Sequence, residues 1–251
     1  MGATRIEFRL RMAIMIVIVT LGFWAPWIEP WGSSYEFAQR IPLLEWLPLQ
    51  LTRLGLLPFS IASPVVIVIG ILFAAVGAIL RIWGAAYLGS FTVHHGQMQA
   101  STVMTAGPFR YMRNPLYLGG WCMMVATSLI MPTTGAMFST TLLTVFFLRL
   151  ILGEETFLAG QFGAPYKAYL KEVPRFIPRF RTALPSAHGK PQWLLAFITE
   201  INPIGIFFIL AFLSWSYNNW LMIKAVLISL GLSLVARAFA PVAQASPNAS
   251  E

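Results

Sequence analysis

The feature of this sequence that most limits its fold is a series of long apolar segments. Residues 64–82 contain one charged side chain, Arg81, and are otherwise apolar. A helix needs about 20 such residues to cross the hydrocarbon core of a bilayer. The whole chain is 57% hydrophobic and 10% charged, whereas a soluble domain carries about 25% charged residues. The sequence therefore predicts an all-α integral membrane protein.

Further apolar segments bring the expected number of transmembrane helices to about six. They cover residues 12–24, 116–131, 136–152, 192–216 and 221–240. The turn Pro132-Thr-Thr-Gly135 separates two of them, so we expect a helical hairpin there. Glu200 and the Asn202-Pro203 pair indicate that the first part of 192–216 lies in the membrane interface.

The first apolar segment, 12–24, is interpreted as a retained helix and not as a signal peptide, because no small-x-small cleavage site follows it. The proline-rich stretch 29–61 predicts a loop with a short amphipathic helix on the membrane. We expect three regions along the chain. They are an N-terminal helix with an interfacial loop (1–61), a membrane core with cytoplasmic cofactor-binding loops (62–182), and a linker with two more helices and a disordered tail (183–251).

Lysine and arginine gather in the segments that lie on one side of this topology. Arginines precede the first span, and cations recur in the segments 107–120 and 153–190, which an N-in arrangement places on the same face. The positive-inside rule then predicts a cytoplasmic N-terminus, in a bacterial inner membrane. The net charge of +8 indicates contact with anionic lipids and not with nucleic acid.

The polar segment 107–120 holds two turn signals, Gly107-Pro108 and Asn114-Pro115. Pro115 suits the first turn of a helix, which places Asn114 at the N-cap. One interpretation is a capped helix start with Arg110 and Arg113 as membrane anchors. The other is an anion site, since a helix N-terminus with nearby cations binds carboxylate or phosphate groups.

A second polar feature is Arg149 followed by Glu154 and Glu155 at the end of an apolar segment. Charged residues near a bilayer usually face a partner or a cavity, and negative charge at a helix C-terminus opposes the helix dipole. We therefore expect this glutamate pair to have a cationic partner, either Arg149, Arg113 or the ammonium group of a ligand. A snorkelling Arg149 with a solvated helix end is the alternative.

The third polar feature is the segment 162–179, in which an apolar stripe alternates with lysines and arginines. This pattern predicts a basic amphipathic helix on the inner membrane surface, where it could roof a site or serve as a simple surface helix. The other residues offer less. His94 and His95 are adjacent and do not form a metal cluster, Cys122 is the single cysteine, and no Gly-x-Gly-x-x-Gly or P-loop motif occurs.

Together these features resemble a known family. The segments that carry the resemblance read TVMTAGPFRYMRNPLY (102–117), RLILGEE (149–155) and FGAPYKAYLKEVPRFIP (162–178). In order and spacing over about residues 60–180 they are similar to the isoprenylcysteine carboxyl methyltransferase and phospholipid methyltransferase family. The chain differs from the family pattern at Ser101, Phe109 and Asn114, and Arg149 lies one residue further from Glu154 than the family arginine does.

The resemblance implies S-adenosylmethionine as the methyl donor, bound at the cytoplasmic face, and a lipophilic acceptor that enters from the bilayer. It implies catalytic roles for Arg113, Arg149 and Glu155. The residues that it implies for cofactor binding are Thr102, Val103, Met104, Gly107, Phe109, Asn114, Pro115, Leu116, Tyr117 and Glu154.

The expected function is methyl transfer to a lipophilic carboxylate of the isoprenylcysteine type, which is deprotonated at pH 7 and needs no general base. The alternative within the same chemistry is N-methylation of a phospholipid such as phosphatidylethanolamine, for which a base such as Glu155 is required. Two other classes stay open: an NADPH-dependent sterol or enone reductase, and a non-catalytic membrane scaffold or small transporter.

Overall fold

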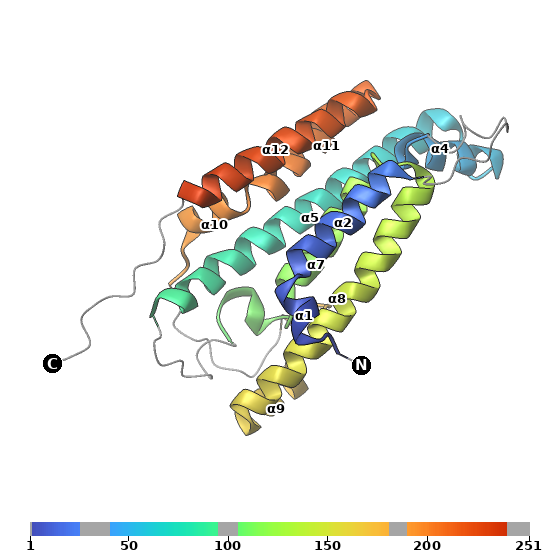
Figure 1. Cartoon of the computed structure of the whole chain (residues 1–251). Coiled ribbons are helices and arrows are strands. Elements are labelled where there is room, and N and C mark those ends of the chain that lie inside the picture. The colour runs from blue at the N-terminus through green and yellow to red at the C-terminus, as the bar shows by residue number, and fades with distance from the viewer. Residues whose placement is uncertain (1, 26–40, 95–104, 181–189, 240–251) are drawn as a thin grey trace.

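The computed structural model describes residues 2–25, 41–94, 105–180 and 190–239, with side chains from 89 to 94 excepted. Regular structure in these ranges is helical (Figure 1), which confirms the expected all-α membrane fold. The helices are α1 (Arg5–Arg9), α2 (Arg11–Trp24), α4 (Leu43–Arg53), α5 (Phe59–His94), η1 (Gly107–Arg110), α7 (Pro115–Ser128), α8 (Thr133–Phe162), α9 (Ala164–Glu172), α10 (Trp193–Thr199), α11 (Ile201–Leu213), η2 (Ser214–Ser216) and α12 (Asn219–Phe239).

Fewer helices than expected are long enough to cross a membrane. Among the described residues α5, α8 and α12 meet the length and hydropathy requirement, and the pair α10–α11 would add a fourth if its 66° bend lies within one span. Helix α2 is apolar but has only 14 residues. The predicted third span, 116–131, is also shorter than expected, because regular α-helical structure ends at Ser128 and three-residue turns take over, with Met131 N–H donating to the Ser128 carbonyl at 3.1 Å.

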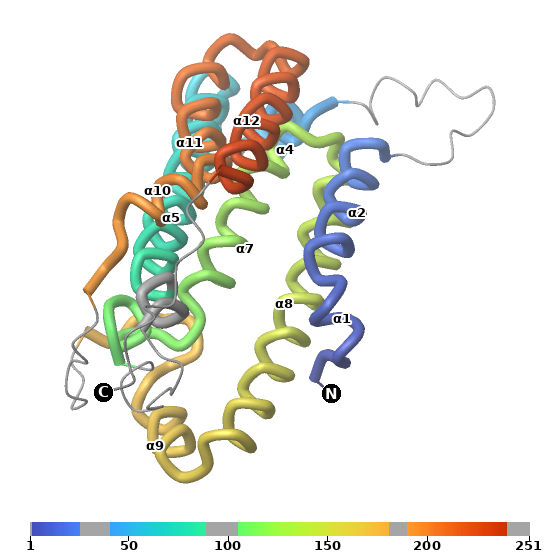
Figure 2. The backbone as a smooth tube through the Cα atoms, turned by 60° about the vertical axis from the view of Figure 1, so that its left-hand side comes forward, coloured from blue at the N-terminus to red at the C-terminus, as the bar shows by residue number. Residues whose placement is uncertain are grey.

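Helix α5 is the centre of the fold. It contacts α4, α7, α10 and α11, while α2 packs on α8 and α12 packs on α11. Helices α7 and α8 form the predicted hairpin, and they diverge from their connecting turn toward the end that carries α9 (Figure 2). The main apolar core lies between α4, α5, α7 and α11, and a second one lies where α2 and α8 meet.

The predicted amphipathic helix in 29–61 is α4, and it packs on the hairpin turn. Its first amides have partners there, since Leu43 N–H and Leu44 N–H donate to the carbonyls of Met131 and Leu129, each at 2.9 Å. These bonds satisfy groups that a helix start leaves unpaired. Helix α5 extends past the C-terminal end of the predicted apolar segment 64–82 and continues as far as His94.

Two glycines allow α2 and α8 to touch. A Cβ atom on Gly135 would overlap the carbonyl oxygen of Gly22. We therefore expect Gly135→Ala to lower the thermal stability of the detergent-solubilised protein, by about 1–3 kcal/mol, as is usual for overpacking. Gly160→Ala is the matched control: it lies on the same helix with nothing within 4 Å of the added Cβ. An equal effect of the two substitutions would contradict the close contact.

Candidate active site

The two polar segments predicted to share one face do lie together, at the end of the bundle that carries α1, η1 and α9 (Figure 2). Backbone hydrogen bonds join them: Arg113 N–H donates to the Pro174 carbonyl at 2.9 Å, and Arg179 N–H donates to the Tyr111 carbonyl at 3.0 Å. The Tyr169 hydroxyl donates to the backbone carbonyl of Phe109 at 2.8 Å. The chain after α9 therefore fixes the polar segment that precedes α7.

Glu155 is the centre of the charges at this end. It is 9% exposed, and its carboxylate accepts from Arg113 Nη1 at 3.0 Å and from Arg175 Nη2 at 2.7 Å. The expected pairing of this carboxylate with Arg113 is thus found. Arg175 was missed, because in the sequence it is one cation among many in the basic segment; its position just after the buried stripe residue Val173 was the available signal. Hydrogen bonding to the Glu155 carboxylate raises the pKa of Arg175.

Glu154 faces a different set of neighbours. Successive residues of a helix are about 100° apart, so Glu154 points away from the ion pairs of Glu155. Its carboxylate interacts with the Tyr117 hydroxyl of α7, and the positive charge of Arg11, at the start of α2, also acts on it. Glu154 therefore joins α8 to α7 without a guanidinium bonded to it among the described residues.

Arg149 does not pair with the two glutamates, contrary to one of the expectations. Its guanidinium binds Glu7 of α1, with Nη2 at 2.9 Å from Oε1 and 3.0 Å from Oε2. Five residues along a helix correspond to about 140° of rotation, which directs Arg149 away from Glu154. The structure therefore gives Arg149 a role in holding the N-terminal helix, whose Ala3 N–H also donates to the Arg149 carbonyl at 2.8 Å.

The Glu7–Arg149 pair predicts how docking of α1 depends on pH. The hydrogen bond from Arg149 lowers the pKa of Glu7 from 4.5 to about 2. A lowered pKa means that the contribution of Glu7 is complete above pH 4.5 and is lost as the pH falls through about 2. We expect hydrogen-exchange protection of α1, corrected for intrinsic rates, to follow this profile. Glu7→Gln should lose the protection already at pH 7, and unchanged protection in that variant would contradict the pairing.

Three residues expected at the cofactor make contacts within the fold. Asn114 occupies the N-cap position but makes no side-chain cap; its Nδ2 instead donates to the Arg175 carbonyl at 3.4 Å. Leu116 packs toward Gly84 of α5, and Gly107, with φ of +55°, packs against the ring of Tyr87. Pro115 begins α7 as predicted. Thr102, Val103 and Met104 lie outside the described residues.

Helix α9 closes this end of the molecule. Its apolar stripe was expected to face the membrane surface, but Tyr166, Tyr169 and Val173 are buried against Leu158 and Phe162 at the end of α8. Burial first, and then the charges of Glu155 and Glu154, raise the pKa of Tyr166 to about 12, so its hydroxyl is protonated at neutral pH. The apolar side of α9 is therefore buried against the end of α8, and its lysines are exposed.

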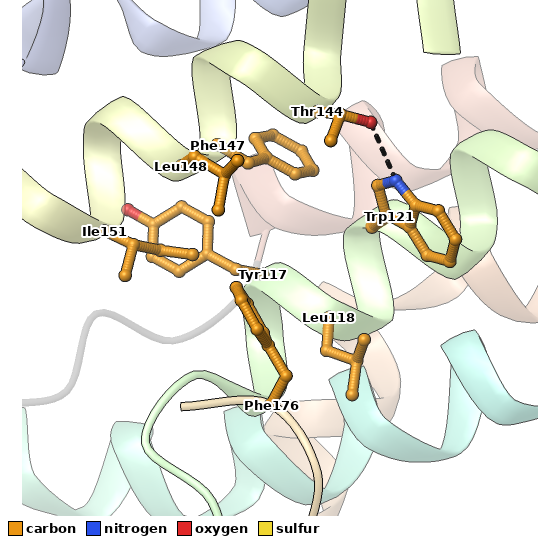
Figure 3. Close-up of a pocket in the computed structure, with 8 residues that line it drawn as sticks. All are labelled: Tyr117, Leu118, Trp121, Thr144, Phe147, Leu148, Ile151 and Phe176. Atoms are coloured by element: carbon orange, nitrogen blue, oxygen red, sulfur yellow. Dashed lines mark hydrogen bonds between the residues drawn. The ribbon is translucent and has the colours of Figure 1, made fainter. Parts of the chain in front are cut away.

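An apolar pocket begins next to these charges and runs between α7 and α8 (Figure 3). Its volume is about 260 Å³. The residues that line it are Tyr117, Leu118, Trp121, Thr144, Phe147, Leu148, Ile151 and Phe176. The polar groups along the wall satisfy each other, since Trp121 Nε1 donates to Thr144 Oγ1 at 2.9 Å. Leu148 is 40% exposed, so the pocket reaches the surface that α8 offers to the bilayer.

A comparison with known families bears on this site. Residues 65–165 match the family model described as phospholipid methyltransferase. This part of the chain is therefore similar to a domain of that methyltransferase family. The matched region extends from α5 through the polar segment and the hairpin to the start of α9, whereas α1–α4 and α10–α12 lie outside the match. Comparisons with curated proteins and with solved structures give no match.

Proposed function

We propose that this protein transfers a methyl group from S-adenosylmethionine to a lipophilic acceptor whose hydrocarbon part lies in the α7–α8 pocket. The observation that carries the proposal is the position of Tyr117. Its ring lines the apolar pocket, and its hydroxyl faces the Glu154 carboxylate. A methyl acceptor held in the pocket would thus end at the charged cluster. A methyl donor is what the methyltransferase domain implies.

The residues at this end suit a zwitterionic, cationic donor. Arg110 Nε and Arg113 Nε are buried and have no hydrogen-bond partner in the described part of the chain. Together with the uncapped N-terminus of α7 they could bind a carboxylate, and Glu154 could bind an ammonium or sulfonium group. When bound, S-adenosylmethionine supplies the methyl group as an electrophile on its sulfonium sulfur. Phe109 is a further residue that we propose for the cofactor site.

The acceptor that we favour is a carboxylate of the isoprenylcysteine type. A carboxylate is already deprotonated at pH 7, so the protein needs only to desolvate and align it. Glu155, the base expected for an amine acceptor, is bound to two guanidinium groups and is poorly placed to take a proton. In this proposal Glu155 orients Arg113, and the apolar wall around Phe147 and Ile151 excludes water.

Phospholipid N-methylation is the second candidate, and Glu154 is the observation in its favour. This carboxylate interacts with the hydroxyl of the pocket residue Tyr117 and could accept the proton of an ammonium acceptor. Both candidates place the charged end of the molecule at the cytoplasmic face of a bacterial inner membrane, where the exposed Lys167 and Lys171 would meet anionic lipids.

One assay separates these candidates. Membranes with and without the protein are incubated with methyl-labelled S-adenosylmethionine, and the lipid extract is treated with alkali. Alkali-labile label indicates an ester and supports carboxylate methylation, whereas label that stays in amine headgroups supports phospholipid methylation. Absence of labelled lipid, together with binding of NADPH but not of S-adenosylhomocysteine, would overturn the proposal in favour of a reductase.

A further inference from the structure

A partly buried ion pair connects the region matched by the family model to the C-terminal helices, which lie outside the match. Arg81 of α5 donates through Nε to Glu200 at 2.6 Å and through Nη2 at 2.9 Å. Glu200 is 5% exposed and sits at the 66° bend between α10 and α11. Charged side chains within membrane-spanning segments are costly and usually belong to a functional site.

The bidentate pair leaves one guanidinium nitrogen of Arg81 available. Nη1 makes no hydrogen bond within the described part of the chain, and it lies 3.6 Å from the point that a Cβ atom on Gly120 would occupy. The same point lies 3.4 Å from Phe147 Cε2, on the wall of the α7–α8 pocket. Arg81 Nη1 and the pocket residue Phe147 therefore approach the same point beside Gly120, which carries no side chain.

A second cation makes the charge of this cluster positive. Arg237 of α12 donates through Nε to the Thr199 carbonyl at 2.9 Å, next to Glu200 in the chain. Arg237 is exposed and bonds a backbone carbonyl, so Glu200 is the one carboxylate among the three charged groups and their net charge is about +1.

We propose that Arg81, held in place by Glu200, binds the anionic group of the membrane amphiphile whose chain lies in the α7–α8 pocket. The ligand class is an amphiphile with a phosphate or carboxylate, and the C-terminal helices contribute to the site by fixing Arg81. For the identity of this amphiphile as the methyl acceptor, the inference rests on the proposed function. Arg81 lies beside Gly120 of α7, and we assign it a role in specificity for the anionic group of the amphiphile.

The test uses the whole protein in neutral maltoside micelles and probes with one chain and different headgroups: dodecyl phosphate, dodecanoate and dodecanol. Calorimetry should show that the wild type binds at least one anionic probe roughly 10- to 100-fold more tightly than dodecanol, as expected for hydrogen bonds to a charged group. Preference for the phosphate would indicate a phospholipid headgroup as the source, and preference for the carboxylate would indicate a carboxylate acceptor.

Two kinds of variant test the residues. Arg81→Gln combined with Glu200→Gln removes both charges together, so no unpaired charge stays buried, and it should lose the anionic preference. Gly120→Leu should lose it too by filling the shared space with the ion pair intact, whereas Gly120→Ala makes only ordinary contacts and should keep it. Arg53→Gln, at the opposite end, is the control for a lost exposed arginine.

Retention of the preference in the double variant, or equal binding of dodecanol and both anions by the wild type, would show that Arg81 is only half of a structural ion pair. Binding of S-adenosylhomocysteine is measured on the same samples. A wild type that prefers anions but does not bind S-adenosylhomocysteine would refute the proposed function and leave the anion site standing. A wild type that binds S-adenosylhomocysteine without anionic preference would refute the anion site and leave the proposed function standing.

Discussion

Replacement of Glu155 by Gln is expected to destabilise the protein by about 3 kcal/mol, the cost of breaking a buried ion pair. The carboxylate holds Arg113 and Arg175 at once, and a neutral amide would leave the buried Arg113 without a counter-ion. We also expect methyl transfer to fall roughly 100-fold, since a displacement of about 1 Å at a reacting centre has that effect. Thermal unfolding and the lipid methylation assay measure the two quantities.

Two further substitutions separate charge loss from loss of position. Arg175→Gln leaves the Arg113–Glu155 bond intact and removes the more exposed of the two arginines, so its effects should be clearly smaller. Glu172→Gln removes an exposed glutamate of α9 and should change neither quantity. If Glu155→Gln were as stable and as active as Glu172→Gln, the carboxylate could not be the element that fixes Arg113.

The fold was predictable where a local pattern determines it. The apolar segment around Arg81 and Pro115 at a helix start act through neighbouring residues, and both are found in the structure. The predicted hairpin is found too, but its turn precedes Thr133, which already begins α8. Span lengths were less predictable. Hydropathy does not show that α7 gives way to tight turns after Ser128, nor that α5 continues to His94.

The partners of individual charges were harder to predict, because they depend on contacts between distant parts of the chain. Arg149 and Glu7 are 142 positions apart, and Arg81 and Glu200 are 119 apart. The pairing of Arg113 with Glu155 was accessible because both belong to segments that the charge distribution places on one face. Asn114 shows the opposite case: its residue type favours a cap, but the neighbouring 173–179 segment offers its side chain a carbonyl group.

The two adjacent glutamates of α8 thus have separate surroundings, and this difference predicts separate mutant phenotypes. Glu155 is neutralised within the protein by two arginines. Glu154 is largely enclosed beside the Tyr117 hydroxyl, with no guanidinium bonded to it among the described residues. A partly buried carboxylate without a bonded cation is unfavourable unless a ligand supplies the positive charge. The proposed cofactor would supply it.

Glu154→Gln is therefore expected to weaken binding of S-adenosylmethionine by roughly 10- to 100-fold, the value of a hydrogen bond to a charged group. In contrast to Glu155→Gln, it should leave thermal stability unchanged or slightly higher, because it removes a carboxylate that lacks a bonded cation. Calorimetry with S-adenosylmethionine and S-adenosylhomocysteine locates the contact. Equal losses for both ligands indicate the ammonium group, and a loss confined to S-adenosylmethionine indicates the sulfonium.

Tyr117→Phe is the matched companion, since it keeps the ring on the pocket wall and removes only the hydroxyl that faces Glu154. We expect it to weaken cofactor binding less than Glu154→Gln does, because the negative charge remains. Wild-type affinity of Glu154→Gln for both ligands would exclude this carboxylate from the cofactor site. The positive charge of the methyl donor would then have to be balanced elsewhere, and Glu155 is already occupied by Arg113 and Arg175.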